Sequence, residues 1–305
     1  MAMGWQAGEA LNRVTLLMGE LSEESFFNRR SRRSSVSRSD LAAAIRAYYR
    51  LADSPRQGFY SPRMNGQSYP TSILTESAWL NLHSKLSPGH ENFYLETRGT
   101  PSVLPPVSQN TANQALARLA ETLIFGTRLV NSLTYRLLGV DIAQKVLKGR
   151  LSVVDFVEYA LTFDLLENEL AEATADGSAM QGRLPLRDRY LPSGNSLTDL
   201  SSRLCVGGPV ALTAIARNRG GRRDYVLLVQ ERSGHVLNAA RRLAVIPKAF
   251  HQPIIDIDEE TNLAMTIERG MEEELFGRPE VDLDGKGNAG PTRCGPTNYP
   301  NPCAG

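Results

Sequence analysis

The hydrophobic and polar positions change their pattern several times along the chain. Apolar residues recur at every third or fourth position between residues 9 and 21, which is the period of an amphipathic helix. A second helix is expected over residues 41–52, where Asp40 stands at the capping position. Prolines, glycines and aromatic residues then interrupt short apolar pieces in residues 54–108, which predicts loops and a few strands.

Helical periodicity dominates residues 109–178. Three helices are expected there, over residues 111–138, 141–149 and 153–173. Helices with such patterns usually pack against one another. The region is therefore predicted to be a scaffold or a surface through which the chain forms an oligomer.

Strand-like patterns follow in residues 179–280. The stretches PVALTAIAR and DYVLLVQER predict two strands, joined by a turn that contains Gly220 and Gly221. The stretch RRLAVIP predicts a third strand that ends at Pro247. An acidic loop then leads into a helix expected over residues 261–276. The order is strand, turn, strand, loop, strand, loop, helix.

The whole pattern predicts an α+β protein with a helix-rich N-terminal region, a partial α/β segment and a Gly/Pro-rich tail. The tail has no aliphatic residue larger than alanine after residue 285, so it is predicted to be disordered. The expected divisions are residues 1–53, 54–108, 109–178, 179–280 and 281–305.

The amino-acid composition limits the classes of molecule that the protein is expected to bind. The 305 residues include 34 lysines and arginines against 33 aspartates and glutamates, so an electrostatic partner must be recognised by a local patch. No apolar run approaches the roughly 18 residues that span a bilayer, and the first residues do not resemble a secretion signal. Three cysteines are too few for a disulfide framework. We therefore expect a cytoplasmic protein without a membrane partner.

One stretch is strongly basic. Residues 28–38 hold five arginines among several serines and have no apolar period, which favours an exposed linker. The alternative is contact with the phosphates of a nucleic acid. The candidate residues for that contact are Arg29, Arg30, Arg32 and Arg33.

The helix expected at 261–276 brings carboxylates to the edge of an apolar face. Its apolar residues are spaced by four and form one stripe: Leu263, Ile267, Met271 and Leu275. Glu274 lies about 40° from the middle of that stripe by the 3.6-residue repeat. A carboxylate at the edge of a buried face needs a partner, because burial of an unpaired charge is costly. A divalent metal ion or an arginine is expected to be that partner.

The order of elements and this helix resemble the Nudix family, whose box is written GX5EX7REUXEEXGU. Arg269 corresponds to the arginine of the box, Met271 to its aliphatic position, and Glu273 with Glu274 to its Glu-Glu pair. The resemblance covers about residues 203–278. It implies a partial Nudix-like α/β segment in the second half of the chain.

In that family the helix carboxylates bind magnesium, and the reaction is hydrolysis of a diphosphate linked to another moiety, usually a nucleoside. The resemblance therefore implies that Glu273, Glu274 and Glu260 hold Mg²⁺ or Mn²⁺, which would activate water. It also implies that Arg269 holds the glutamates in place. The small-molecule partner implied is a nucleoside diphosphate derivative.

Two residues of the preceding loop are candidate ligand-binding residues. Lys248 and His251 lie where a substrate would approach, and His251 could serve as a general base. The chain also departs from the box, since Gly270 stands where the box has its first helical glutamate. Two functions stay open: a Nudix-like protein that binds and hydrolyses its ligand, or a non-catalytic regulatory protein. In the second, the segment senses the ligand and the basic N-terminal run contacts nucleic acid.

Overall fold

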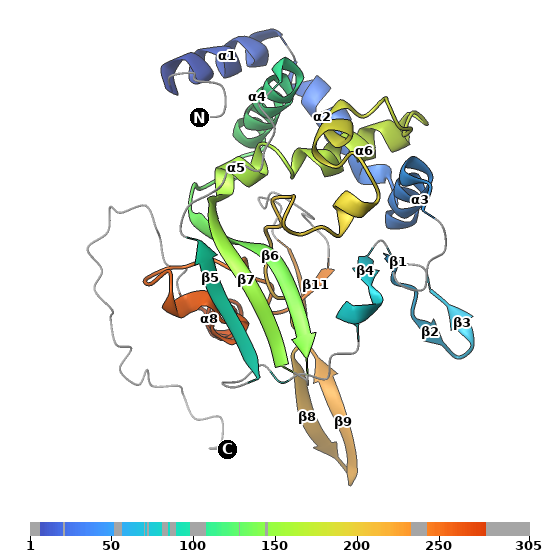
Figure 1. Ribbon diagram of the computed structural model, residues 1–305, viewed down its shortest axis with the longest axis vertical. Helices are drawn as coiled ribbons and strands as arrows, with labels where there is room; N and C mark the ends of the chain where they lie inside the picture. Colours follow the sequence, from blue (N-terminus) through green and yellow to red (C-terminus); the bar gives the residue numbers. More distant parts are fainter. Residues whose placement is uncertain are drawn as a thin grey trace, which may run out of the picture.

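A computed structural model of the chain shows an α+β protein in which a layer of helices covers one end of a three-stranded sheet (Figure 1). A further helix packs beside the sheet, and a long hairpin projects from the opposite end. The structure describes residues 7–20, 22–51, 57–69, 71, 73–80, 85, 90–97, 108–127, 129–143, 146–232 and 243–278.

The helical layer brings together segments that are far apart in the sequence. Its main helices are α1 (Ala7–Glu20), α2 (Glu23–Ser35), α3 (Arg38–Tyr49), α4 (Gln109–Ile124) and α6 (Leu165–Ala175). Helix α1 packs against α4, and α2 and α3 both pack against α6. Val14, Phe26 and Leu116 form one apolar cluster between α1, α2 and α4. The helices of residues 1–53 thus pack against those of residues 109–178.

The arginine-rich stretch is helical, so the expectation of an exposed linker is wrong for residues 28–35. The Ser22 side chain caps the helix by accepting a hydrogen bond from the backbone N–H of Ser25. Acidic residues in the first turn and arginines in the last turn suit the helix dipole. Arginine also has good helix propensity. Glutamates on α4 and α6 form ion pairs with the arginines of α2 and so take the place of solvent around their charges.

A three-stranded sheet forms the centre of the protein. Its strands are β5 (Glu91–Thr97), β7 (Val146–Asp155) and β6 (Leu133–Ala143), in the order β5-β7-β6. Strand β5 runs parallel to β7, and β6 runs antiparallel to it. The expectation of helices across residues 133–155 is therefore wrong. Helix α4 ends at Ile124, and the short helix α5 (Phe156–Ala160) begins after β7.

The sheet is buried against both the helical layer and the C-terminal segment. Phe93, Tyr135 and Leu151 form a cluster with Leu263 from the C-terminal helix. Phe93 lies opposite Gly149, where a Cβ atom would come within 2.1 Å of its ring. A side chain at position 149 would therefore displace the ring from the core.

Smaller elements surround this core. They are β1 (Gln57–Phe59), β2 (Arg63–Met64), β3 (Gln67–Ser68), β4 (Leu74–Glu76), η1 (Ser77–Trp79), α7 (Pro185–Tyr190) and η2 (Asn195–Leu197). Strand β1 pairs with β4, and β2 pairs with β3. The loops and few strands expected in residues 54–108 are confirmed for the described part of that region.

The C-terminal elements follow the predicted order. They are β8 (Ala214–Arg219), β9 (Arg222–Leu227), β10 (Val229–Glu231), β11 (Leu243–Val245), η3 (Glu259–Thr261) and α8 (Leu263–Phe276). Gly220 and Gly221 both have positive φ and form the turn between β8 and β9. The expected tail, residues 281–305, lies outside the described residues. None of the described helices is long and apolar enough to cross a membrane.

Candidate functional site

Helix α8 carries three of the predicted site residues, Arg269, Glu273 and Glu274, and its buried face differs from the expected one. Thr266 and Gly270 are buried, whereas the predicted apolar stripe is only half-buried. The expectation that the stripe itself is the centre of the buried face is therefore wrong. The loop before α8 approaches the helix at Thr266 and Gly270 and fills the space there.

Gly270 lies against that loop. A Cβ atom at this position would stand 3.0 Å from Cβ of Pro247 and 3.4 Å from Cβ of Ala249. The first distance is closer than a normal carbon–carbon contact, and Pro247 is a buried, rigid ring. A side chain at the position where the Nudix box has a glutamate would therefore have to push Pro247 aside by a few tenths of an ångström.

An antiparallel backbone pairing holds this loop in place. The N–H of Ala211 donates to the carbonyl of Pro247 at 3.0 Å, and the N–H of His251 donates to the carbonyl of Gly207 at 2.9 Å. The segment from Pro247 to His251 is extended, so its side chains alternate in direction. Pro247 and His251 are buried, whereas Lys248 and Phe250 are exposed.

His251 is held by hydrogen bonds inside the protein. Its Nε2 lies 2.9 Å from the carbonyl oxygen of Thr261, and its Nδ1 lies 2.8 Å from Oγ1 of Thr266. Because a carbonyl only accepts, Nε2 carries the proton and Nδ1 accepts from the Thr266 hydroxyl. Burial lowers the pKa of His251 to about 4, although the hydrogen bond to Thr261 opposes this. The imidazole is therefore neutral at pH 7 and fastens the loop to α8.

Glu260 organises the acidic loop. Its carboxylate accepts hydrogen bonds from the backbone N–H groups of Ile254 and Ile255, both at 2.7 Å, and of Asp256 at 3.1 Å. Arg269 Nη1 lies 3.3 Å from Glu260 Oε2. Burial alone would raise the pKa of Glu260, but the backbone hydrogen bonds and Arg269 lower it below its ordinary value. The carboxylate is therefore charged and engaged with the chain itself.

The structure brings the predicted residues together in two pairs. Arg269 contacts Glu260 and also donates to the carbonyl of Gln252 at 3.0 Å. Glu274 accepts a hydrogen bond of 3.3 Å from the backbone N–H of Lys248, so it has the partner that its position requires. That partner is neither a metal ion nor an arginine. Across the part of the chain that the structure describes, three or more His, Cys, Asp or Glu side chains do not gather as a metal site would require.

Glu91 is a residue of this region that the sequence did not single out. It lies on β5, and its carboxylate accepts hydrogen bonds from the N–H groups of Leu263 and Ala264 at 3.0 and 3.1 Å. The side chain of Asn262, at the usual capping position, makes no such bond. Because Glu91 precedes α8 by 172 residues, no local pattern could indicate this contact.

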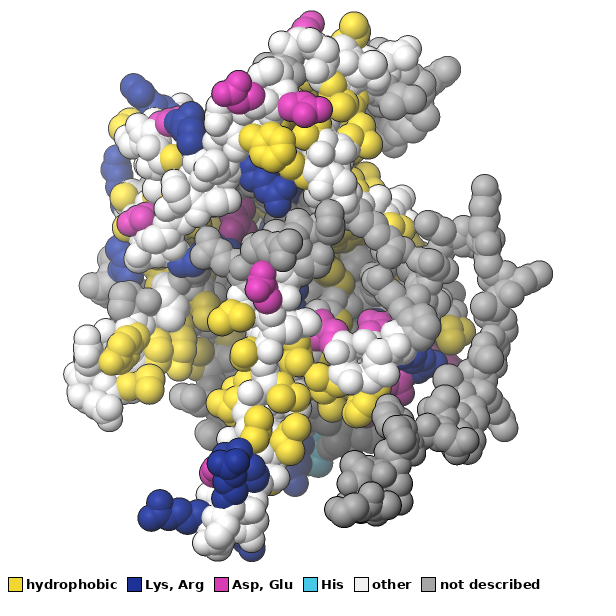
Figure 2. All heavy atoms as spheres, turned by 180° about the vertical axis from the view of Figure 1, so that it is seen from behind, with side chains coloured by type: hydrophobic (Ala, Val, Ile, Leu, Met, Phe, Trp, Pro, Cys, Tyr) yellow, Lys and Arg dark blue, Asp and Glu magenta, His cyan; other side chains and the backbone are white. Residues whose placement is uncertain are grey.

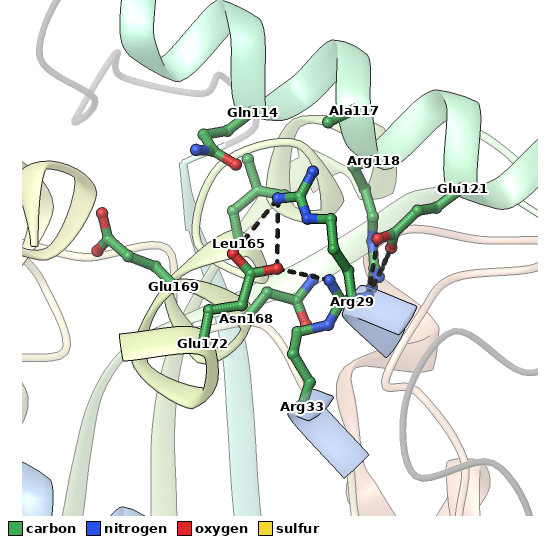
Figure 3. Close-up of a pocket in the computed structure, with 10 residues that line it drawn as sticks. All are labelled: Arg29, Arg33, Gln114, Ala117, Arg118, Glu121, Leu165, Asn168, Glu169 and Glu172. Carbon is green, nitrogen blue, oxygen red and sulfur yellow. Dashed lines mark hydrogen bonds and ion pairs between the residues drawn. The ribbon is translucent and has the colours of Figure 1, made fainter. Parts of the chain in front are cut away.

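The predicted nucleic-acid residues form a second cluster, between α2, α4 and α6. Figure 3 shows Arg29 and Arg33 directed at the carboxylate of Glu172, at 3.3 and 2.7 Å. Arg33 also reaches Glu121 at 2.8 Å. Burial alone would lower the pKa of Arg33, but Glu121 and Glu172 raise it overall. Arginine and glutamate side chains line a small pocket between these helices. Their ion pairs connect α2 to α4 and to α6.

The other arginines of the run also have partners inside the protein. Arg32 pairs with Asp176 on the end of α6, and Arg30 lies over the ring of Phe125 at 4.4 Å. These contacts give the run a structural role. Its contact with nucleic acid stays a prediction, as does an oligomer formed through the helical region.

The comparisons with known proteins add no relative. No protein-family model, no curated protein and no solved structure matches the chain. The Nudix resemblance therefore rests on the residues of the segment 203–278 themselves.

Proposed function

We propose that this chain is a non-catalytic regulatory protein whose Nudix-like segment binds a nucleoside diphosphate derivative without hydrolysing it. The observation that carries the proposal is the contact between Gly270 and Pro247. The family's metal site uses two carboxylates four residues apart on the helix, and here the first of them is absent.

The ligand class follows from the resemblance and from the exposed side of the loop. Lys248 and Phe250 both have exposed side chains, and their positions are about 7 Å apart because they are two residues apart in an extended segment. The Phe250 ring also contacts the ring of Phe156, with centroids 5.1 Å apart. An ammonium group suits a diphosphate, and an aromatic ring suits stacking with a base. The contacts of His251 beneath them keep this segment rigid, which lowers the entropic cost of binding.

A divalent metal ion enters the proposal as a companion of the ligand. Mg²⁺ often binds protein through one or two carboxylates together with substrate phosphates. Glu274 lies beside the backbone of Lys248, so a diphosphate held by Lys248 would lie near this carboxylate. Glu273 is the second carboxylate of the pair, and Mn²⁺ would serve in the same way.

A thermal-shift titration with ADP and ADP-ribose, with and without Mg²⁺, tests the proposal. A ligand at 100 times its Kd stabilises the folded state by about 2.7 kcal/mol, so the melting temperature should rise. Lys248→Gln and Phe250→Ala should reduce that rise. Glu268→Gln, an exposed change on the same helix, is the matched control and should leave the rise unchanged.

Product analysis on the same samples separates binding from catalysis. We expect no release of phosphate-ester products with Mg²⁺ or Mn²⁺. Metal-dependent turnover that disappears in Glu273→Gln or Glu274→Gln would show an enzyme instead. If neither a shift nor turnover is measured, the resemblance does not extend to ligand binding.

A further inference from the structure

The hairpin formed by β8 and β9, residues 214–227, projects from the body of the protein; we call it the ribbon (Figure 1). It carries four arginines and one aspartate, although the whole chain has a formal charge of only +1. Figure 2 shows lysine and arginine side chains gathered at the end of this projection. The ribbon is therefore a local basic patch on an otherwise balanced chain.

The register of the ribbon places like charges side by side. Arg219 lies directly opposite Arg222, next to the turn. Like charges in such a cross-strand pair destabilise a hairpin. Two positions further from the turn, Arg217 forms two hydrogen bonds with Asp224, at 2.8 and 2.6 Å, so its charge is neutralised.

The remaining positive charges of the ribbon face solvent. Arg219, Arg222 and Arg223 are exposed, and the described residues provide no ion pair for them. The ribbon pairs only with itself, as a two-stranded sheet. Such a ribbon is marginally stable in isolation, and these three arginines contribute nothing to a core. Their arrangement fits a partner that supplies negative charge.

We propose that the ribbon binds double-stranded DNA, with its tip in the major groove. That groove is about 12 Å wide and admits a two-stranded β-ribbon. Arg219 and Arg222 lie on one face of the ribbon and Arg223 on the other, so cations face both walls of the groove. Guanidinium groups match phosphate oxygens and the edge of guanine.

Other residues of the ribbon suit the same partner. Gly220 and Gly221 add no side chain at the turn, which lets the backbone approach the DNA closely. Asn218 lies opposite Arg223 and offers an amide to base edges. Tyr225, on the same face, is 66% exposed and adds an apolar surface behind the basic tip.

The geometry favours DNA over two other polyanions. The major groove of A-form RNA is too narrow for side chains to read. A membrane surface would require the apolar side chains to enter first, but Tyr225 and Leu227 lie behind the arginines, toward the base of the ribbon. The inference does not depend on the proposed ligand site, because it uses none of the residues of that site.

Fluorescence anisotropy with a labelled duplex of about 20 base pairs tests the inference with the full chain. If three phosphates are neutralised, the affinity should fall about 40-fold when salt is raised from about 50 to about 200 mM. The variant with Arg219→Gln, Arg222→Gln and Arg223→Gln should bind at least tenfold more weakly at the lower salt, and its salt dependence should nearly vanish. The same three positions changed to lysine should keep the salt dependence.

The matched control removes three charges elsewhere, by Arg63→Gln, Arg150→Gln and Arg183→Gln, at exposed positions outside the basic run 28–38. It should bind DNA like the wild type, and circular dichroism should show that both variants are folded. The inference is overturned if the wild type does not bind the duplex, or if the ribbon and control variants lose affinity equally. Binding to anionic lipid vesicles but not to DNA, lost in the ribbon variant, would assign the ribbon to a membrane surface instead.

Discussion

The carboxylate of Glu91 on β5 accepts a hydrogen bond of 3.0 Å from the backbone N–H of Leu263, at the start of α8. It therefore does for this helix what a capping side chain does in others. We expect Glu91→Ala to lower the free energy of unfolding by about 1–2 kcal/mol, since it removes the cap and a charge favoured by the helix dipole. Urea denaturation measures the change.

Glu96→Gln is the matched control, on the same strand. Glu96 pairs with Arg150 at the surface, where both side chains are more than 40% exposed. Such pairs contribute at most about 1 kcal/mol. An equal loss from Glu91→Ala and Glu96→Gln would contradict a capping role for Glu91.

The second prediction concerns Glu260 and acid. Its pKa is lower in the folded protein than its ordinary value of 4.5, so the charged carboxylate stabilises the fold above that pH. We expect Glu260→Gln to cost about 2–3 kcal/mol at neutral pH, because charge-assisted hydrogen bonds are lost. The difference from wild type should shrink as the pH falls below 4.5 through the folded pKa. Urea titrations at several pH values measure it, and Glu259→Gln, an exposed neighbour, should show no such trend.

The sequence predicts the C-terminal strands, their glycine turn and α8, because each has a local signal. It fails for residues 133–155, where leucines at helical spacing lie in strands. The failure has a physical cause at Arg136, which is 1% exposed and donates hydrogen bonds to the carbonyls of Ser201 and Arg203. The buried arginine in this strand is satisfied by backbone carbonyl groups that lie some 65 residues later in the chain. A periodic pattern of apolar residues cannot reveal such a distant hydrogen-bond partner.

The candidate site was predictable in the same limited way. The sequence indicated that Glu274 needs a partner, and it has one in the backbone of Lys248. It could not show that Glu260 accepts three backbone hydrogen bonds, or that His251 points into the protein. Those facts depend on how the loop folds over α8. The missing glutamate at Gly270 was visible, but the close approach of Pro247 to that position was not.

The third prediction follows from the neutral state of His251. Its pKa is about 4 in the folded protein and 6.5 ordinarily, so between these values the unfolded chain binds more protons than the folded one. Stability should therefore fall by roughly 3 kcal/mol as the pH is lowered from 6.5 to 4. NMR of the imidazole should give a midpoint near 4, and His251→Gln should flatten the pH dependence of unfolding in this window. A midpoint near 6.5 would contradict the buried, neutral imidazole.

The fourth prediction compares three residues that form ion pairs between α2, α4 and α6: Glu121, Arg33 and Arg32. Glu121 lies 2.8 Å from Arg33 and 3.6 Å from Arg118, and all three side chains are at most 10% exposed. Glu121→Gln leaves two buried guanidinium groups without this charge and should cost about 3–5 kcal/mol. Arg33→Gln should lower the free energy of unfolding by less, because Glu121 still forms its ion pair with Arg118. Arg32→Gln, at an exposed pair, should cost at most about 1 kcal/mol. Urea denaturation gives the order, and equal losses for Glu121 and Arg32 would contradict the structure of the cluster.

The last prediction tests the contact that decides the proposed function. Replacing a helical glycine by alanine usually stabilises a protein by up to about 1 kcal/mol. Gly19→Ala in α1 should show this gain, because its Cβ atom would meet nothing within 4 Å. Gly270→Ala should instead cost about 1–3 kcal/mol, since the new methyl group presses on Pro247.

Gly270→Glu restores the residue type of the Nudix box at the crowded position. It should lower the melting temperature further than Gly270→Ala, and it should not create metal-dependent hydrolysis of ADP-ribose, because the side chain cannot enter without displacing the loop that carries Lys248. A stable Gly270→Glu variant with Mg²⁺-dependent turnover would show that the loop yields easily. The absent carboxylate, and not the packing of Pro247 on α8, would then be what separates this protein from an enzyme.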